Sequence, residues 1–154
     1  QGQTLAFPAP NAFGASLYLR ALLAEKHKLS IRPAYVKTHS NVYRHVLTGE
    51  AAAAGGIRVT LDHESAEIRD RLRVLYETPA SAPHPIAAHP RVPAALREKI
   101  SAAMLSLARE DTGAALLRSV QMGQPVPADY RRDYQALQEL GLERYLVLDG
   151  PAKK

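Results

Sequence analysis

The sequence contains no cysteine, no long apolar run and no dense block of basic residues. Without cysteine there are no disulfide bonds, thiolate metal sites or cysteine nucleophiles. No apolar run approaches the roughly 20 residues that a membrane-spanning helix requires, so we expect a chain that does not span a membrane. The densest basic pairs are Arg131-Arg132 and Lys153-Lys154. Such short pairs do not form the basic arm typical of nucleic-acid binding, and we expect no nucleic-acid partner.

Several catalytic and metal-binding patterns are missing as well. There is no Gly-x-Ser-x-Gly elbow, no phosphate-binding Gly-x-x-x-x-Gly-Lys loop and no His-Glu-x-x-His helix. His39 and His45 are six residues apart and do not share a helical face, and His84 and His89 point to opposite sides of an extended segment. No acid and base pair is visible beside His39 or His84. We therefore expect no enzymatic activity, no metal and no cofactor.

What is present indicates a folded domain that favours anions. A chain of 154 residues is long enough to bury a core, and 46% hydrophobic residues agree with a globular protein. Lysine and arginine total 20 against 15 acidic residues, which gives a net charge of +5. A moderate basic excess of this kind favours anionic partners without naming one.

Hydrophobic periodicity and turn residues predict an α/β fold in the first half of the chain. The predicted order is strand, helix, strand, helix, strand, over residues 4–7, 11–26, 31–36, 40–49 and 51–54. A break at Gly55-Gly56 precedes a further predicted strand at 57–61. We expect Asn11 to cap the first helix, and Ser40 or Asn41 to cap the second.

The pattern continues beyond residue 61, and the final third of the chain is predicted to be helical. The predicted elements are a helix at 64–71, strands at 72–79 and 86–88, and helices from Pro93 to 107, at 113–120 and at 130–140. The two strands flank or lie within the proline-rich stretch ASAPHPIAAHPRVP. The helix from Pro93 carries apolar residues at helical spacing, which predicts a core-facing stripe: Leu96, Ile100, Ala103, Met104 and Leu107.

The turn Pro10-Asn11-Ala12-Phe13-Gly14-Ala15-Ser16 is the first candidate site. The N–H groups in the first turn of a helix have no partner within the helix and can bind an oxyanion, and the Ser16 hydroxyl adds a donor. Gly14 permits close approach of a ligand to the backbone. The alternative is an ordinary capped helix start.

A second group of donors, Thr38-His39-Ser40-Asn41, lies at the start of the next predicted helix. Two helix starts at the same ends of neighbouring strands converge on one cleft, where α/β sheets usually bind ligands. Capping by Ser40 or Asn41 is again the alternative. His84, in the proline-rich stretch, is a candidate for a hydrogen-bonding residue in the wall of the ligand site.

In its succession of segments the chain resembles the periplasmic phosphonate-binding proteins, which are the substrate-binding proteins of phosphate, phosphite and phosphonate ABC transporters. The resemblance runs from about Thr4 to Val147 and rests on the stretches LAFPAPNAFGAS, VKTHSNVYRHVLTGEAAAAGG and LRVLYETPASAPHPIAAHPRVP. It implies a type 2 periplasmic-binding-protein-like fold with two α/β lobes. Here it implies an α/β ligand-binding lobe at 4–72, a return crossover and C-terminal helices of the other lobe at 73–147, and a flexible tail at 148–154.

The same resemblance implies where the ligand binds. The family's phosphonate loop falls on residues 10–16, and its Gly-His motif falls on residues 38–41. Together with the donor patterns above, the expected ligand-binding residues are Asn11, Ala12, Phe13, Gly14, Ser16, His39, Ser40, Asn41 and His84. Ala12, Phe13 and Ala15 replace hydroxyl residues of the family's loop, so hydroxyl donation is left to Ser16.

A second departure concerns the ligand's tail. Phosphonate binders often carry an aspartate in the small-residue strand that meets the amino group of an aminophosphonate, and here Ala51 to Ala54 are all alanine. This argues against a cationic tail and favours phosphate, phosphite, an alkylphosphonate or another small anion.

The implied function is that of a periplasmic solute-binding protein that delivers a small oxyanion to an ABC transporter permease. The alternative is a sensory input domain of a signalling protein with the same fold. The family's N-terminal half is not in the sequence, so we expect either a fragment of a two-lobed protein or a reduced relative. Helices without their full sheet would expose apolar faces, and we expect self-association into a homo-oligomer.

Overall fold

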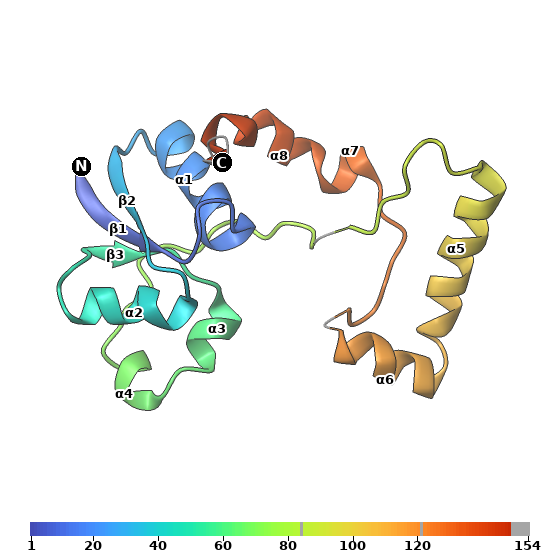
Figure 1. The fold of residues 1–154 in the computed structure, drawn as a ribbon, viewed down its shortest axis with the longest axis horizontal. Coiled ribbons are helices and arrows are strands. Elements are labelled where there is room, and N and C mark those ends of the chain that lie inside the picture. Colours follow the sequence, from blue (N-terminus) through green and yellow to red (C-terminus); the bar gives the residue numbers. More distant parts are fainter. Residues whose placement is uncertain (84, 121, 149–154) are drawn as a thin grey trace, which may run out of the picture. The chain divides into compact units, whose positions relative to one another are not determined.

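The computed structural model describes residues 1–83, 85–120 and 122–148. The chain divides into two compact units, Gln1–Ala80 with the chain from Ala136 onward, and Ser81–Gln135. Figure 1 labels the helices and strands of both units. Of the expected tail 148–154 only Leu148 is described, and the candidate His84 lies outside the described residues.

A three-stranded parallel sheet in the order β2-β1-β3 forms the centre of the first unit. The strands are β1 (Gln3–Phe7), β2 (Ile31–Tyr35) and β3 (Ala53–Ala54). Ala6 of β1 is in register with Ala34 of β2 on one side and with Ala54 of β3 on the other. The prediction of an α/β fold with strands in these three places is confirmed.

One continuous helical segment, residues 13–26, follows β1. It consists of η1 (Phe13–Tyr18), α1 (Leu19–Ala21) and η2 (Leu22–Lys26), and both η segments are π-helical. The predicted helix is confirmed, but its predicted cap is wrong. Ala12 occupies the N-cap position without a side-chain cap, because Asn11 lies one residue too early and bonds instead to the backbone of Val147.

The second helix is α2 (His39–Leu47), and its N-cap is Thr38. The Thr38 Oγ1 accepts a hydrogen bond of 3.2 Å from the Asn41 N–H. Ser40 and Asn41 lie inside the first turn, so the prediction that one of them caps the helix is wrong. Gly49 follows the helix end with a φ of +79°, a left-handed conformation that glycine adopts readily.

The two helical segments cover opposite faces of the sheet. Successive side chains of a strand point to opposite faces, and the neighbours Ala6 and Phe7 of β1 are both fully buried. Ala6 packs in a cluster with Val42 of α2 and with Ala51. Phe7 lies on the other face beside Tyr35 of β2, with ring centroids 6.3 Å apart. The small core of this unit therefore lies on both sides of β1.

Beyond β3 the chain becomes helical, with α3 (Arg58–Asp62) and α4 (Ala66–Arg69). The strand predicted at 57–61 is wrong, because the Ile57 carbonyl accepts hydrogen bonds from the N–H groups of Thr60 and Leu61 and so starts a helical turn. The helix predicted at 64–71 is confirmed in its central part.

Residues 72–80 form neither helix nor strand, so the strand predicted at 72–79 is wrong. Val74 and Leu75 are largely exposed, and no strand of the described residues pairs with them. An apolar β-type sequence needs a neighbouring strand to satisfy its backbone groups. The brief strand predicted at 86–88 is wrong for the same reason.

The second unit contains α5 (Ala94–Leu107), α6 (Asp111–Ser119) and α7 (Tyr130–Asp133). Gly113 allows the close turn between the first two, because a Cβ there would lie 2.1 Å from the Leu107 carbonyl oxygen.

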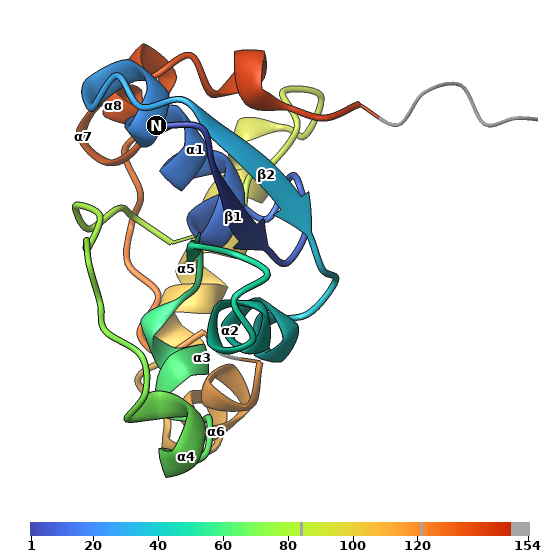
Figure 2. The same cartoon turned by 90° about the vertical axis from the view of Figure 1, so that its left-hand side faces the viewer.

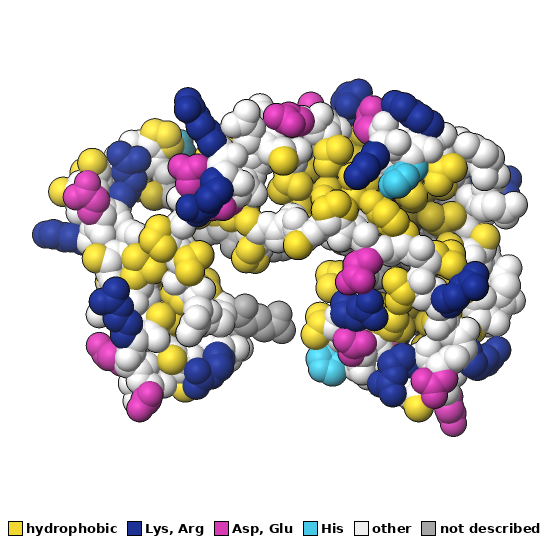
Figure 3. Space-filling model, turned by 180° about the vertical axis from the view of Figure 1, so that it is seen from behind, with side chains coloured by type: hydrophobic (Ala, Val, Ile, Leu, Met, Phe, Trp, Pro, Cys, Tyr) yellow, Lys and Arg dark blue, Asp and Glu magenta, His cyan; other side chains and the backbone are white. Residues whose placement is uncertain are grey.

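The predicted helices are confirmed, but the prediction that the α5 stripe is core is wrong. No residue of α5 is buried, and Leu96 and Ile100 are 48% and 46% exposed. Figure 3 shows hydrophobic side chains on the surface.

The last elements are α8 (Gln135–Glu139) and the 3-10 helix η3 (Leu142–Tyr145). Gly141 separates them with a φ of +59°, as expected for a residue that stops a helix. The segment after Gly141 returns to the 13–26 helix of the first unit, a contact described with the site.

Candidate anion-binding site

The segments that leave the three strands lie side by side at one end of the sheet, where the strands have their carboxyl ends. Parallel strands bring their carboxyl ends to the same edge, and the β1 and β2 arrows in Figure 2 point the same way. The Val36 N–H donates to the Phe7 carbonyl at 2.9 Å, and the Gly55 N–H donates to the Ala6 carbonyl at 2.9 Å. The 13–26 helix and α2 both begin just beyond this edge. Both helix starts therefore lie at the same end of the sheet, and their convergence on one ligand cleft stays a prediction.

At the first helix start, donors remain without acceptors. The N–H groups of Ser16 and Leu17 both donate to the Ala12 carbonyl at 3.0 Å, which leaves those of Gly14 and Ala15 without an acceptor among the described residues. The Ser16 side chain is fully buried, and its hydroxyl has no hydrogen-bond partner in the described structure. A buried hydroxyl is destabilising when it is unpaired, so Ser16 carries an unsatisfied donor at this helix start.

The chain after β3 packs directly beneath this first turn. A Cβ on Gly55 would lie 2.1 Å from the Ala15 carbonyl oxygen and 2.6 Å from the Phe7 ring. Only a residue without a side chain fits at this position. The sequence suggested merely a flexible break here, since close approach of two segments distant in sequence leaves no local signal.

The second helix start offers fewer free side chains. Ser40 Oγ donates to the Glu64 carboxylate at 2.5 Å, and Asn41 Nδ2 donates to the Val36 carbonyl at 3.0 Å. The Nδ1 atom of His39 is buried and has no partner in the described residues. The N–H groups of His39 and Ser40 also meet no acceptor in the part of the chain that the structure describes. Among the described residues, these two N–H groups and the His39 ring are therefore donors left at this start.

Two other predicted residues of the first turn make contacts within the protein. The Ala12 N–H donates to the Ala9 carbonyl at 3.3 Å, and Ala12 contributes only backbone to the turn. The Phe13 ring stacks on that of Tyr18, with centroids 5.6 Å apart and planes inclined by 6°. The half-buried Phe13 ring therefore forms part of the helix surface next to the free N–H groups.

Tyr43 fixes α2 against the helix that follows β3. Its hydroxyl bonds to Thr60 Oγ1 at 2.8 Å and donates to the Ile57 carbonyl at 3.3 Å. Burial raises the pKa of Tyr43 above its ordinary value of 10.0, so the phenol stays protonated. A Cβ on Gly56 would lie 2.6 Å from that hydroxyl, and a small residue is therefore needed there too.

The loop before the 13–26 helix is held by the chain's C-terminal segment, which sequence reasoning missed. The Asn11 amide donates to the Val147 carbonyl at 2.8 Å and accepts from its N–H at 3.0 Å. The guanidinium of Arg20 donates to the carbonyls of Pro10 and Tyr145, both at 2.7 Å. The Asn11 side chain, predicted to face a ligand, is thus engaged with Val147.

The same segment is anchored at Glu25. The Tyr145 hydroxyl donates to the Glu25 carboxylate at 2.6 Å, and Arg144 lies 3.0 Å from it. The hydrogen bond from Tyr145, with the charges of Arg144 and Lys28, lowers the pKa of Glu25. The same hydrogen bond raises the pKa of Tyr145. Glu25 is therefore ionised, and Tyr145 is protonated, at neutral pH.

No group of three or more potential metal ligands comes together in the residues that the structure describes. Among the same residues, none of the helices has the length and apolar character needed to cross a membrane.

A family model described as ABC transporter, phosphonate, periplasmic substrate-binding protein matches residues 1–134. Searches of curated proteins and of solved structures found no match. The matched range includes both helix starts and most of the chain, and it confirms the family suggested by the sequence. The chain belongs to the family of periplasmic substrate-binding proteins of phosphonate ABC transporters.

Proposed function

We propose that this chain binds a small oxyanion of the phosphonate, phosphate or phosphite class and delivers it in the periplasm to an ABC transporter permease, without catalysing a reaction. The observation that supports this most is the buried Ser16 hydroxyl, which has no partner in the described structure and lies in the first turn of a helix. The second helix start, at the same sheet edge, supplies the His39 ring.

The available donors suit a multivalent oxyanion. They comprise the N–H groups of Gly14, Ala15, His39 and Ser40, the Ser16 hydroxyl and the His39 ring. A buried oxyanion needs several donors to offset the loss of its hydration. The positive ends of two helix dipoles add a further favourable term, and the net charge of +5 acts in the same direction.

The proposed ligand has no cationic tail. β3 and the residues before it, Ala51–Ala54, offer only methyl groups, and no carboxylate of this strand could pair with an amino group. Inorganic phosphate, phosphite or a short alkylphosphonate therefore suits the site better than an aminophosphonate. With Ser16 as the single hydroxyl donor of the loop, we expect modest affinity.

We further propose that a second lobe completes the cleft, in a type 2 periplasmic-binding architecture that closes by hinge motion. On this proposal the chain is either a fragment of a two-lobed protein or a reduced relative. Comparison of the intact mass of the purified protein with the length of its reading frame tests this point.

A sensory input domain is the alternative function. It is favoured by the replacement of loop hydroxyls at Ala12, Phe13 and Ala15, which would weaken uptake of a scarce solute but suits a sensor of an abundant one. Permease and ATPase genes beside the coding sequence would favour transport. A kinase or cyclase domain on the same chain would favour sensing.

The experiment that tests oxyanion binding is calorimetric titration and thermal unfolding of the purified protein with phosphate, phosphite and methylphosphonate. We expect at least one of them to bind and to raise the unfolding temperature. 2-Aminoethylphosphonate serves as the matched comparison, and it should bind more weakly than methylphosphonate. Absence of any response in the intact protein would contradict the proposal.

A further inference from the structure

We propose that Arg20 and the C-terminal strap, defined as residues 142–147, position the loop 8–12 that leads into the candidate anion site, so that strap docking and anion binding are coupled. The positioning part stands on contacts within the first unit alone. The coupling part rests on the proposed function.

Arg20 joins the loop to the strap through a single guanidinium group. Its Nη2 donates to the Pro10 carbonyl of the loop and to the Tyr145 carbonyl of the strap, both at 2.7 Å. The guanidinium carbon also lies 5.8 Å from the centroid of the Tyr35 ring in β2. Charge-assisted bonds in a partly buried place are stronger than neutral ones on the surface, so Arg20 fixes the loop relative to both strap and sheet.

Asn11 makes the second link. Its side-chain amide exchanges two hydrogen bonds with the backbone of Val147, at 2.8 and 3.0 Å. The next residue is Ala12, whose carbonyl accepts the first helical hydrogen bonds from Ser16 and Leu17. The two residues that the strap holds, Pro10 and Asn11, therefore directly precede the turn in which the N–H groups of Gly14 and Ala15 are free.

Glu25 holds the strap at the other end of the same helix. It accepts a hydrogen bond of 2.6 Å from the Tyr145 hydroxyl and lies 3.0 Å from Arg144. The strap thus contacts the C-terminal end of the 13–26 helix at Glu25, its middle at Arg20, and the loop in front of it. Removal of the Tyr145 hydroxyl would loosen the strap without altering any group in the anion site.

Coupling has a thermodynamic consequence that can be measured from both sides. If the docked strap favours the loop geometry that binds an anion, the anion must favour the docked strap by the same factor. The Val147 N–H, which donates to Asn11 Oδ1, reports docking. The N–H groups of Ala12 and Ser16 report the loop and the first turn.

Amide hydrogen exchange by NMR tests the positioning in the full chain, without ligand and with methylphosphonate or phosphate as the probe. In Tyr145→Phe we expect faster exchange at Val147, and also at Ala12 and Ser16. The matched control is Tyr134→Phe, which removes the hydroxyl bond to Pro83 in the second unit and should leave these three amides unchanged. Arg20→Met should have a larger effect, and Arg20→Lys should restore part of it.

The affinity for the probe anion tests the coupling. We expect Tyr145→Phe to weaken binding several-fold, and the anion to slow exchange at Val147 in the unmodified protein.

Faster exchange at Val147 with unchanged exchange at Ala12 and Ser16 would overturn the positioning, whether or not an anion binds. A looser loop with unchanged affinity would overturn the coupling. Absence of binding in the unmodified protein would contradict the proposed function, and the ligand-free exchange data would still decide the positioning.

Discussion

The side-chain amide of Asn11 pairs with the backbone of Val147 through two hydrogen bonds, although the residues are 136 positions apart in the sequence. The amide offers a donor and an acceptor in the same arrangement as a peptide group, so the contact resembles one bridge of a β-ladder. It ties the loop before the first helix to the end of the described chain. The sequence predicted that Asn11 caps a helix or contacts a ligand. In the structure its side chain instead makes a tertiary contact.

Ser16→Ala should lower anion affinity without lowering stability. The Ser16 hydroxyl is buried and unpaired in the described structure, so its removal relieves an unsatisfied group. A hydrogen bond to a charged ligand contributes about 1.5–3 kcal/mol, which corresponds to a loss of affinity of roughly tenfold or more. Calorimetry measures affinity and urea unfolding measures stability. Ser101→Ala, on the exposed surface of α5, is the control, and unchanged affinity in Ser16→Ala would contradict the role of the hydroxyl.

Thr38→Ala should destabilise the first unit by about 1 kcal/mol, the usual effect of losing a helix N-cap. The Thr38 Oγ1 accepts the Asn41 N–H, and alanine has no acceptor. Thr38→Ser keeps the oxygen and should retain most of the stability. Chemical unfolding followed by far-UV circular dichroism gives both values. Equal stability of the alanine and serine variants would show that the cap is unimportant.

Gly55→Ala should destabilise the protein by about 1–3 kcal/mol, as expected for overpacking. The new methyl carbon would lie 2.1 Å from the Ala15 carbonyl oxygen, so the first turn of the helix would have to move. The displacement should also weaken anion binding. Gly123→Ala, where a Cβ meets nothing within 4 Å, is the matched control. An unfolding temperature as high as that of the control would be evidence against this tight contact.

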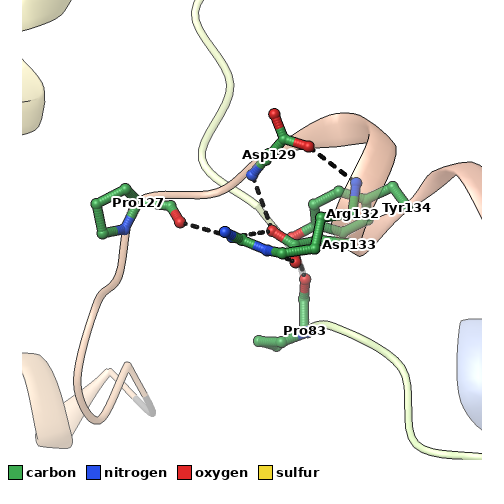
Figure 4. A network of polar contacts seen from close by, with 6 residues as sticks. All are labelled: Pro83, Pro127, Asp129, Arg132, Asp133 and Tyr134. Carbon is green, nitrogen blue, oxygen red and sulfur yellow. Dashed lines mark hydrogen bonds and ion pairs between the residues drawn. The ribbon is translucent and has the colours of Figure 1, made fainter.

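Asp133 should titrate far below an ordinary aspartate. Hydrogen bonds from Arg132, at 2.6 and 2.7 Å, and from the Asp129 N–H lower the pKa of Asp133 from 3.8 to about 2. Figure 4 shows this network. A lowered pKa stabilises the folded state above the ordinary value, and the contribution is lost as the pH falls from about 4 towards 2.

Carboxyl NMR shifts during an acid titration measure the pKa of Asp133 directly. Arg132→Gln removes the first cause and should return the pKa of Asp133 towards 3.8. A midpoint near 3.8 in the unmodified protein would disagree with the network that Figure 4 draws.

The exposed stripe of α5 should promote self-association. Leu96 and Ile100 are about half exposed. Leu116 in α6 and Val120, which directly follows α6, are more exposed. Removal of such apolar surface from water favours association. Multi-angle light scattering should show oligomers that Ile100→Lys shifts towards the monomer. Ser101→Lys adds the same charge beside the stripe and should have less effect, and a monodisperse monomer of the unmodified chain would rule the prediction out.

The local pattern of the sequence was sufficient for the order of the first five elements and for the approximate places of the two helix starts. Strand-forming residues before Phe7 and Tyr35, and helical spacing after Ala12 and Thr38, are short-range signals, and the structure places the elements there. The combination of these segments also indicated the family. The parallel arrangement follows from the order, because a helix between neighbouring strands carries the chain back to the same end of the sheet.

Only the tertiary structure decided how individual residues are used. Residues 57–61 and 72–79 have β-type sequences, but a strand exists only where a neighbour supplies its hydrogen bonds. Thr38 rather than Ser40 caps α2 because the helix begins at His39, two residues earlier than a cap at Ser40 requires. Asn11 meets Val147, and Gly55 meets Ala15, because the fold brings together segments far apart in the chain. Partners of that kind leave no mark in the local sequence, and they determine which donors of the candidate site remain free for an anion.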